Sequence, residues 1–302
     1  MGSSAAYAMA ISQVVSELVI IDVNREKAMG EAMDINHGLP FLGQMNIYAG
    51  DYSDCHDCDV IVVTAGLGRK PGETRLDLAN KNVPIAKEIT ANIMKYYTQG
   101  VILVVSNPLD ILTYMIQKWS GLPNGMVFGT GTSLDSSRFR YLLSKKFNVD
   151  VNNIHGYIIG EHGDTQFPAW SVTNIGGKKI SDYCNDGSGV FNETDKPLIT
   201  QEVITAGAQT IKYKGATYYA IAVVINSMVE TILKNQNSIR TVSSILDGNY
   251  GVSDVALSLP SVIGANGVVR ILDVALDETE EILLRYSADQ IKEFLSQFKK
   301  YL

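Results

Sequence analysis

A histidine and an Asp-x-x-Arg segment are the parts of this sequence with the clearest capacity for proton transfer and anion binding. His162 lies within Gly-Glu-His-Gly-Asp at 160–164, and an imidazole can accept or donate a proton near neutral pH. Arg138 follows Asp135 by three residues, so on one helix both side chains project from the same face. The guanidinium could there bind a carboxylate through two parallel hydrogen bonds. Taken singly, the two features have ordinary alternatives, which are a buried structural histidine and a surface ion pair.

Two further polar residues follow predicted strands. Arg75 lies in a polar segment that contains Pro and Gly, and such a segment can close over a bound molecule and bring a cation to it. Asn107 follows another predicted strand and could form a hydrogen bond at a reacting centre. The ordinary alternatives are a solvated loop charge for Arg75 and a turn residue before Pro108 for Asn107.

The elements that would position these side chains alternate between strand and helix in the first part of the chain. Short β-branched runs predict strands at 18–22, 60–63 and 101–105. Small-residue loops end the last two runs, and loops at the carboxyl ends of strands bind ligands in open α/β sheets. Apolar residues at helical spacing over 80–97 predict a crossover helix. We therefore expect a Rossmann-type, doubly wound parallel sheet over 1–129.

The pattern becomes mixed beyond about Gly131. Helices are predicted at 200–212, at 214–234 and in a C-terminal amphipathic segment after Asp277. The fold class expected for the whole chain is α/β, with an α+β substrate domain over 130–302.

The first residues are similar to the later part of a dinucleotide-binding fingerprint. Gly2 opens a helix-like stretch that leads into the strand ending at Asp22, and an acid in this position binds the adenosine ribose hydroxyls. Because the sequence shows neither the preceding strand nor two earlier glycines, we expect a fingerprint that is truncated at its N-terminus. Asp22 favours NAD over NADP, since its carboxylate would repel a 2′-phosphate. A chance glycine and a chance strand-ending acid are the alternative.

Composition excludes several classes of protein. The 302 residues carry a net charge of −7 without a basic cluster, so nucleic acid is not an expected partner. Neither a bilayer span nor a secretory signal is visible in the sequence, and three cysteines are too few for a disulfide framework, so we expect a cytoplasmic protein without membrane association. Cys55 and Cys58 form a Cys-x-x-Cys that no second ligand pair follows, so no metal site is expected.

Four segments, in order over essentially the whole chain, resemble the lactate/malate dehydrogenase superfamily. They are Ala-Gly-Leu-Gly-Arg-Lys-Pro-Gly-Glu-Thr-Arg-Leu-Asp-Leu (65–78), Val-Ser-Asn-Pro-Leu-Asp (105–110), Leu-Asp-Ser-Ser-Arg-Phe-Arg (134–140) and Ile-Gly-Glu-His-Gly-Asp-Thr (159–165). The resemblance implies reversible hydride transfer between NAD and a small 2-hydroxy acid. It also implies that His162 exchanges the hydroxyl proton, with Asp135 fixing its tautomer and favouring its charged form.

The same resemblance assigns the remaining site residues. Arg138 is expected to bind the substrate carboxylate, Arg75 to approach the substrate carbonyl, and Asn107 to form a hydrogen bond at the reacting centre. The expected cofactor contacts are Gly2, Asp22, Thr64, Ala65, Gly66, Val105 and Asn107.

Two residues point to different substrates. Arg69 is similar to the lid arginine of malate dehydrogenases, which pairs with a second substrate carboxylate, whereas lactate enzymes commonly carry Gln there. Thr217 and the amino-acid sequence of the 70–78 segment are similar to those of lactate dehydrogenases. We favour L-lactate and pyruvate on Thr217 and the 70–78 segment. Malate and oxaloacetate are the alternative, because the cation of Arg69 would be unpaired if it faced the methyl group of pyruvate.

Regulation and assembly follow from the resemblance alone. Arg140 and His155 match residues with which bacterial members of the superfamily bind fructose 1,6-bisphosphate, and a homo-oligomer, expected to be a tetramer, would pair these residues across subunits. An Arg on a helix and a His before a strand are the ordinary alternative. A second functional class also stays open: a catalytically impaired oligomer of the same fold that binds NAD poorly.

Overall fold

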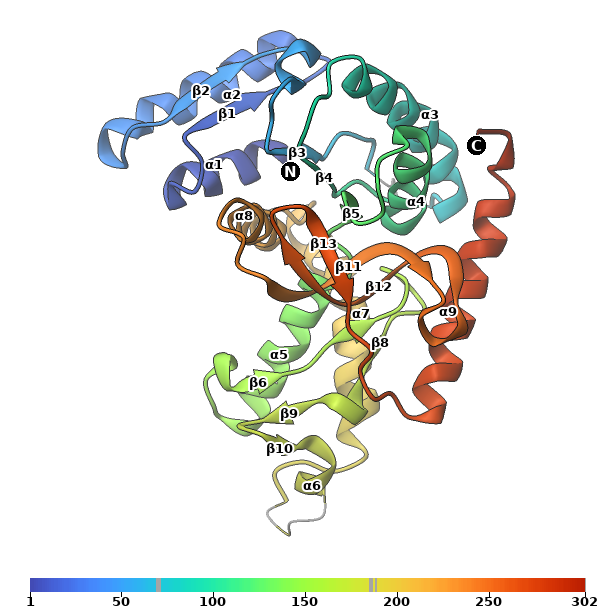
Figure 1. Cartoon of the computed structure of the whole chain (residues 1–302). Coiled ribbons are helices and arrows are strands. Elements are labelled where there is room, and N and C mark those ends of the chain that lie inside the picture. Colours follow the sequence, from blue (N-terminus) through green and yellow to red (C-terminus); the bar gives the residue numbers. More distant parts are fainter. Residues whose placement is uncertain (69–71, 185–186, 188, 302) are drawn as a thin grey trace.

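The computed structural model describes residues 1–68, 72–184, 187 and 189–301, and Figure 1 shows their arrangement. The helices are α1 (Gly2–Ser12), α2 (Arg25–Gly38), α3 (Arg75–Met94), α4 (Leu109–Ser120), α5 (Ser133–Phe147), α6 (Ile180–Cys184), α7 (Asp195–Lys214), α8 (Tyr219–Leu233) and α9 (Glu278–Ser296). The strands are β1 (Glu17–Ile20), β2 (Asn46–Ala49), β3 (Val60–Val63), β4 (Val101–Val104), β5 (Val127–Gly129), β6 (Ile154–His155), β7 (Ile158–Ile159), β8 (Phe167–Pro168), β9 (Asn174–Ile175), β10 (Lys178–Lys179), β11 (Ser238–Asp247), β12 (Ser253–Gly264) and β13 (Gly267–Ile271).

The largest sheet joins strands from both parts of the chain, in the order β13-β12-β11-β5-β4-β3. β3, β4 and β5 run parallel, whereas β11 pairs antiparallel with β5 through Ser243 and Gly129. The α/β class with parallel central strands is therefore confirmed. β1 and β2 form a separate parallel pair, and in the described part of the chain neither strand is hydrogen-bonded to β3.

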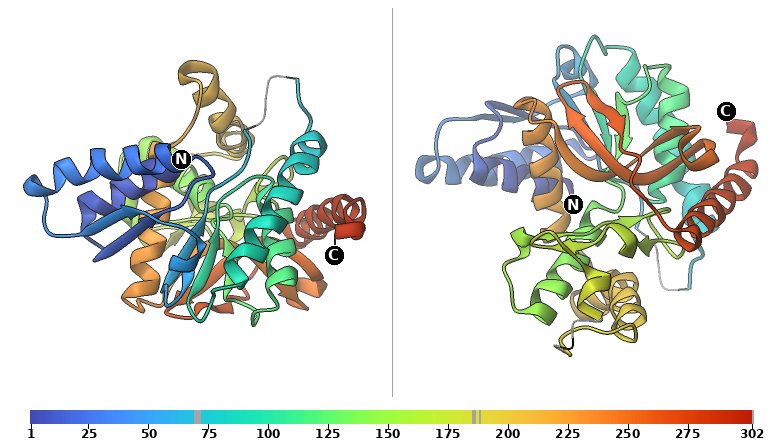
Figure 2. Two further views of the ribbon diagram at one scale, coloured as in Figure 1. Left: turned by 90° about the horizontal axis from the view of Figure 1, so that it is seen from above. Right: turned by 60° about the horizontal axis from the view of Figure 1, so that its bottom comes forward.

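The central strand β4 is buried on both faces, as its unbroken Val-Ile-Leu-Val run requires. Alternate side chains of a strand point to opposite faces. Val101 and Leu103 pack in one apolar cluster with residues of α1 and α8, while Ile102 and Val104 pack in another with residues of α3, α4 and α9. Helices thus cover both faces of the sheet, which Figures 1 and 2 show from different sides.

Helix α3 begins at a capping box that fixes the residue expected to face the substrate. Thr74 accepts a hydrogen bond from the backbone N–H of Asp77, and the Asp77 carboxylate accepts one from the backbone N–H of Thr74. Arg75 is therefore the first residue of a 20-residue helix rather than part of the preceding polar loop.

No helix in the described ranges has the combination of length and apolar character that crossing a bilayer requires.

Candidate active site

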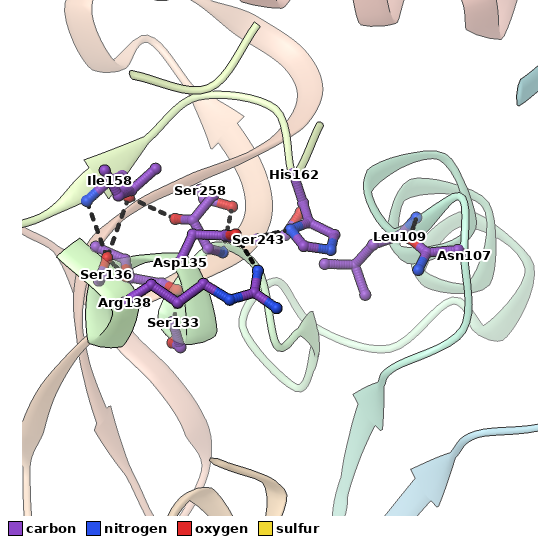
Figure 3. A network of polar contacts seen from close by, with 12 residues as sticks. Asn107, Leu109, Ser133, Asp135, Ser136, Arg138, Ile158, His162, Ser243 and Ser258 are labelled. Carbon is purple, nitrogen blue, oxygen red and sulfur yellow. Dashed lines mark hydrogen bonds and ion pairs between the residues drawn. The ribbon is translucent and has the colours of Figure 1, made fainter. Parts of the chain in front are cut away.

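His162 and Asp135 meet although 27 positions separate them in the sequence. His162 lies in the loop between β7 and β8, and Asp135 lies in the first turn of α5. The imidazole Nδ1 is 2.9 Å from Oδ2 of Asp135, whose side chain is only 2% exposed. Figure 3 shows the opposite edge of the ring turned toward Asn107 and Leu109. The imidazole is thus held at one nitrogen and left with the other for proton exchange.

Arg138 binds the same carboxylate from the next turn of α5. Its guanidinium is 2.9 Å from Oδ1 of Asp135, so one acid holds both the histidine and the arginine (Figure 3). The three-residue spacing on a helix places the two side chains on one face, as the sequence predicts. The Arg138 side chain is 21% exposed, so part of this guanidinium remains available to an anion.

Charge outweighs burial in setting the protonation of this pair. Burial alone would lower the pKa of His162, but the charge and hydrogen bond of Asp135, together with the charge of Asp110, raise the pKa above its ordinary value. Burial alone would likewise raise the pKa of Asp135, but His162 and Arg138 lower it. Asp135 is therefore held ionised and His162 is biased toward its charged form.

Arg75 reaches the backbone of the histidine loop, as its position at the start of α3 allows. Its guanidinium pairs with the largely buried Glu161, lies 3.7 Å from Asp164 and is 3.5 Å from the carbonyl oxygen of His162. A side chain at Gly163 would overlap this guanidinium. In this structure Arg75 is thus bound to protein carboxylates beside His162, within the same small region as the Asp135 pair.

Asn107 lies on the loop after β4. Hydrogen bonds from Asn82, on α3, connect this loop to the loop after β3. The buried side chain of Asn82 donates hydrogen bonds to the carbonyl oxygens of Asn107 at 2.7 Å and Leu67 at 3.0 Å, and accepts one from the Leu67 N–H at 2.8 Å. A Cβ on Gly66 would lie 3.2 Å from the same amide. Asn82 therefore fixes the relative position of the two strand-end loops that were expected to contact the cofactor.

The two residues that bear on substrate choice are less informative in the structure. Arg69 lies outside the described residues. Thr217 lies in the loop between α7 and α8 and is partly exposed. Their roles therefore stay predictions from the sequence.

The predicted NAD contacts gather at the ends of β1, β3 and β4. Gly2 begins α1, and a Cβ added there would lie 2.8 Å from Oγ1 of Thr64, so glycine permits close approach of the helix to the end of β3. The N–H groups of a first helical turn have no partner within the helix and suit a phosphate. Asp22 follows β1 with a side chain that is 36% exposed. These residues fit a dinucleotide.

The remaining predicted cofactor contacts occupy the strand-end loops themselves. Ala65 and Gly66 follow β3 and are exposed, whereas Val105 follows β4 and is buried. Ser106, which the sequence did not single out, donates its hydroxyl to the carbonyl oxygen of Ala65 at 2.6 Å and so joins the two loops.

The predicted effector residues lie on two neighbouring elements, α5 and β6. Arg140 is half-buried on α5 and its Nε is 3.4 Å from the carbonyl oxygen of Ser136, while His155 is exposed on β6. Burial, and then the charge of Arg240 on β11, lower the pKa of Arg140. Arg240 was not anticipated from the sequence, because pairing of β11 with the central sheet brings it into this region.

Asp110 is a further acid at the site to which the sequence assigned no role. It lies in the first turn of α4, is 2% exposed, and accepts hydrogen bonds from the backbone N–H of His162 and the hydroxyl of Ser243. Its place in the Val-Ser-Asn-Pro-Leu-Asp segment was a signal, but its partners lie 52 and 133 positions away.

No group of three or more His, Cys, Asp or Glu residues within the described ranges has an arrangement that could hold a metal ion. Cys55 is buried, Cys58 is partly buried, and both are free thiols. Burial raises the pKa of Cys55 to about 11, which disfavours the thiolate that binds metals.

Comparison with known proteins covers nearly the whole chain. Residues 1–129 match the family model for the lactate/malate dehydrogenase NAD binding domain, and residues 132–301 match that for the lactate/malate dehydrogenase alpha/beta C-terminal domain. A curated L-lactate dehydrogenase of Thermoanaerobacterium saccharolyticum is 52% identical over 296 residues, which are 98% of this chain and 95% of the relative.

Solved structures give the same result. An L-lactate dehydrogenase from Clostridium thermocellum is 61% identical with a TM-score of 0.88, over 99% of this chain and 96% of that one. The ligand-bound minor L-lactate dehydrogenase of Enterococcus mundtii is 40% identical with a TM-score of 0.95, over 98% of this chain and 95% of that one.

Proposed function

The chain belongs to the lactate/malate dehydrogenase family, and from this premise we propose that it is an NAD-dependent L-lactate dehydrogenase. The observation that supports this proposal most directly is the single buried carboxylate of Asp135, which binds both the imidazole of His162 and the guanidinium of Arg138. This arrangement places a proton-exchanging group beside a group that binds carboxylates, as a 2-hydroxy acid requires.

Proton transfer follows from the geometry of the His162–Asp135 pair. Asp135 accepts a hydrogen bond from Nδ1–H, so in the neutral ring Nε2 carries the lone pair that takes the hydroxyl proton of L-lactate. NAD held along the ends of β3 and β4 would supply the hydride acceptor for the hydrogen on the hydroxyl-bearing carbon, and NADH would supply the hydride in the reverse direction. In pyruvate reduction the imidazolium of His162 donates its Nε2 proton to the carbonyl oxygen, and Asp135 stabilises the charged ring before that transfer.

Three other side chains bind or orient the substrate. Arg138 binds the carboxylate through two parallel hydrogen bonds, for which its planar guanidinium is suited. Asn107 forms a hydrogen bond at the reacting centre. Arg75 approaches the substrate carbonyl after leaving Glu161, and its positive charge stabilises the oxygen as negative charge develops there.

Residues 1–129 form the NAD-binding domain in this proposal and residues 130–302 form the substrate domain. The amino end of α1 at Gly2 binds the pyrophosphate, and Asp22 binds the adenosine ribose hydroxyls. Thr64, Ala65, Gly66, Val105 and Asn107 line the path of the cofactor along the ends of β3 and β4.

Substrate preference is the experiment that tests this function. We expect steady-state kcat/KM to be higher for pyruvate than for oxaloacetate, and Arg69→Gln to raise that preference by about tenfold, since it removes a cation able to pair with the second carboxylate of oxaloacetate. The matched control is Lys95→Gln, which removes a positive charge at the end of α3 whose ammonium group binds Asn92. A strong preference of the unmodified protein for oxaloacetate would assign malate dehydrogenase activity instead, as Arg69 alone suggests.

An anionic effector forms the second part of the proposal. Arg140 and Arg240 bring two half-buried guanidinium groups near each other, and β6 with His155 packs beside α5. We expect fructose 1,6-bisphosphate to lower the KM for pyruvate about fivefold or more, and Arg140→Gln and His155→Gln to abolish the response. Initial rates over a range of effector concentrations measure this effect. An unchanged KM together with an unchanged sedimentation profile would remove the effector from the proposal.

Assembly and location complete the proposal. We infer a homo-oligomer, with a tetramer as the expected state, and a cytoplasmic location that is compatible with the free thiols of Cys55, Cys58 and Cys184.

A further inference from the structure

Asp110 is a buried acid that the mechanism above does not use. Its Oδ2 is 2.7 Å from the backbone nitrogen of His162, and its Oδ1 is 2.6 Å from the hydroxyl oxygen of Ser243. One carboxylate thus joins α4, the loop between β7 and β8, and β11. Since both partners are donors and an ionised carboxylate only accepts, both oxygens are satisfied by the charged form.

The electrostatic surroundings of His162 include charged groups from four elements. Asp135 on α5 and Asp110 on α4 raise the pKa of the imidazole, whereas Arg75 on α3 lowers it. Glu161, next to His162 in the loop, is paired with Arg75. Burial raises the pKa of Asp110 above its ordinary value and outweighs the Ser243 hydroxyl and the charges of His162 and Arg75, which act in the opposite direction. The two hydrogen-bond donors at its oxygens favour the charged form, and in that form Asp110 and the imidazolium of His162 stabilise each other.

We propose that Asp110 is a positioning residue for proton transfer, which anchors the backbone of His162 and supplies the second negative charge that holds the imidazole protonated. This inference rests on the proposed function. The two acids then have different roles. Asp135 binds the imidazole of His162 and fixes its tautomer, whereas Asp110 binds the backbone N–H of His162 and raises the pKa of the ring through its negative charge.

Replacing Asp110 with asparagine distinguishes the effect of its negative charge from the effect of its hydrogen bond to the His162 backbone. Its amide oxygen can still accept from the His162 N–H, and its NH₂ group can donate to Ser243, whose hydroxyl can turn to accept. Asp110→Asn therefore keeps both contacts and removes the negative charge. Asp254→Asn is the matched control, because Asp254 is an exposed acid that binds Tyr114 and Lys118 on the same helix without touching His162.

The test is the pH dependence of kcat/KM for pyruvate. Reduction needs protonated His162, so activity falls as pH rises through the pKa of the imidazole. Removal of a nearby negative charge lowers that pKa, and we expect the midpoint in Asp110→Asn to move to lower pH by about half a unit or more. In Asp254→Asn the midpoint should stay where it is. A midpoint that does not move in Asp110→Asn overturns the inference, whatever happens to the rate, since a purely structural role would lower kcat or Tm only.

Two measurements keep the inference testable if turnover or folding is affected. An NMR titration reports the His162 imidazole directly among the four histidines of the chain, with the spectrum of His162→Gln identifying its signal. Ser243→Ala removes the hydroxyl that favours the ionised form of Asp110, so the His162 midpoint should move in the same direction by a smaller amount. An unchanged titration in both variants contradicts the inference. Failure of the unmodified protein to reduce pyruvate would instead contradict the proposed function. The NMR titration would still test the effect of Asp110 on the pKa of His162, because it does not depend on turnover.

Discussion

Replacing His162 with glutamine is expected to lower kcat/KM for pyruvate by about 10³-fold, the usual contribution of a positioned general acid. Glutamine can still donate a hydrogen bond to Asp135, but it has no proton to exchange near neutral pH. Single-turnover NADH oxidation with pyruvate in excess measures the loss at the chemical step. Binding of NADH, followed by fluorescence, should change little because the contacts proposed for the dinucleotide lie elsewhere.

His56→Gln is the matched control for this experiment. His56 is a surface histidine with a 60% exposed side chain that pairs with its neighbour Asp57, so its loss should leave the rate unchanged. In the unmodified protein, pyruvate reduction should decline only above pH 6.5, which is the ordinary pKa of histidine, because the pKa of His162 is raised. Lactate oxidation, which needs the neutral imidazole, should instead increase as the pH rises through the same pKa. A His162→Gln variant that keeps its activity to within tenfold would contradict the proposed proton-transfer role.

Arg138→Lys is expected to lower kcat/KM for pyruvate by about 100-fold, mainly through a higher KM. Lysine keeps the positive charge but cannot form two parallel hydrogen bonds with a carboxylate, and hydrogen bonds to charged groups contribute about 1.5–3 kcal/mol each. The ammonium group can also bind Asp135, so the pair with His162 should persist. Initial rates over a wide range of pyruvate concentrations separate the KM effect from kcat.

A second conservative exchange controls for loss of the guanidinium as such. Arg285→Lys alters an exposed arginine that pairs with Glu281 one turn earlier on α9, and its effect on KM should be negligible. If Arg138→Lys binds pyruvate as well as the unmodified protein, the carboxylate must be held by another group.

Local pattern predicted the elements of the fold better than their ends. The β3 strand was predicted at its observed bounds, because an apolar run between turn residues has a clear signal. The helix predicted at 80–97 begins five residues earlier, at Arg75, because the Thr74–Asp77 capping box starts it, and apolar periodicity does not report caps. Likewise α7 begins at Asp195, before its first buried residue, Ile199.

Strand pairing was beyond the reach of sequence pattern. Periodicity locates strands but does not select their partners, so nothing in the sequence indicated that β11, more than 100 residues after β5, continues the parallel strands in antiparallel sense. β11 pairs with β5 through Ser243 and Gly129, and the hydroxyl of this same Ser243 binds Asp110. Long-range contacts of this kind depend on the packing of whole elements.

The candidate site was predictable where a motif carried it and hidden where tertiary contacts made it. The Gly-Glu-His-Gly-Asp segment and the Asp-x-x-Arg spacing indicated His162, Asp135 and Arg138, and the structure brings these three together. Asp110 ends the Val-Ser-Asn-Pro-Leu-Asp segment, but in the first turn of a helix an acid is also what the helix dipole favours, so the sequence assigned it no distinct role. Its burial and its donors become visible only once three distant segments are packed.

Because Asp135 binds both His162 and Arg138, the affinity for the substrate and the basicity of the imidazole should depend on each other. In the proposed mechanism Arg138 turns part of its hydrogen-bonding capacity to an incoming carboxylate, so its interaction with Asp135 should weaken and more of that acid's charge should act on the imidazole. Thermodynamic linkage then requires the converse: ring protonation must tighten the binding of the keto acid by the same factor. Pyruvate should consequently draw a proton from solution as it binds above the pKa of His162, and the enthalpy of binding should vary with the ionisation heat of the buffer.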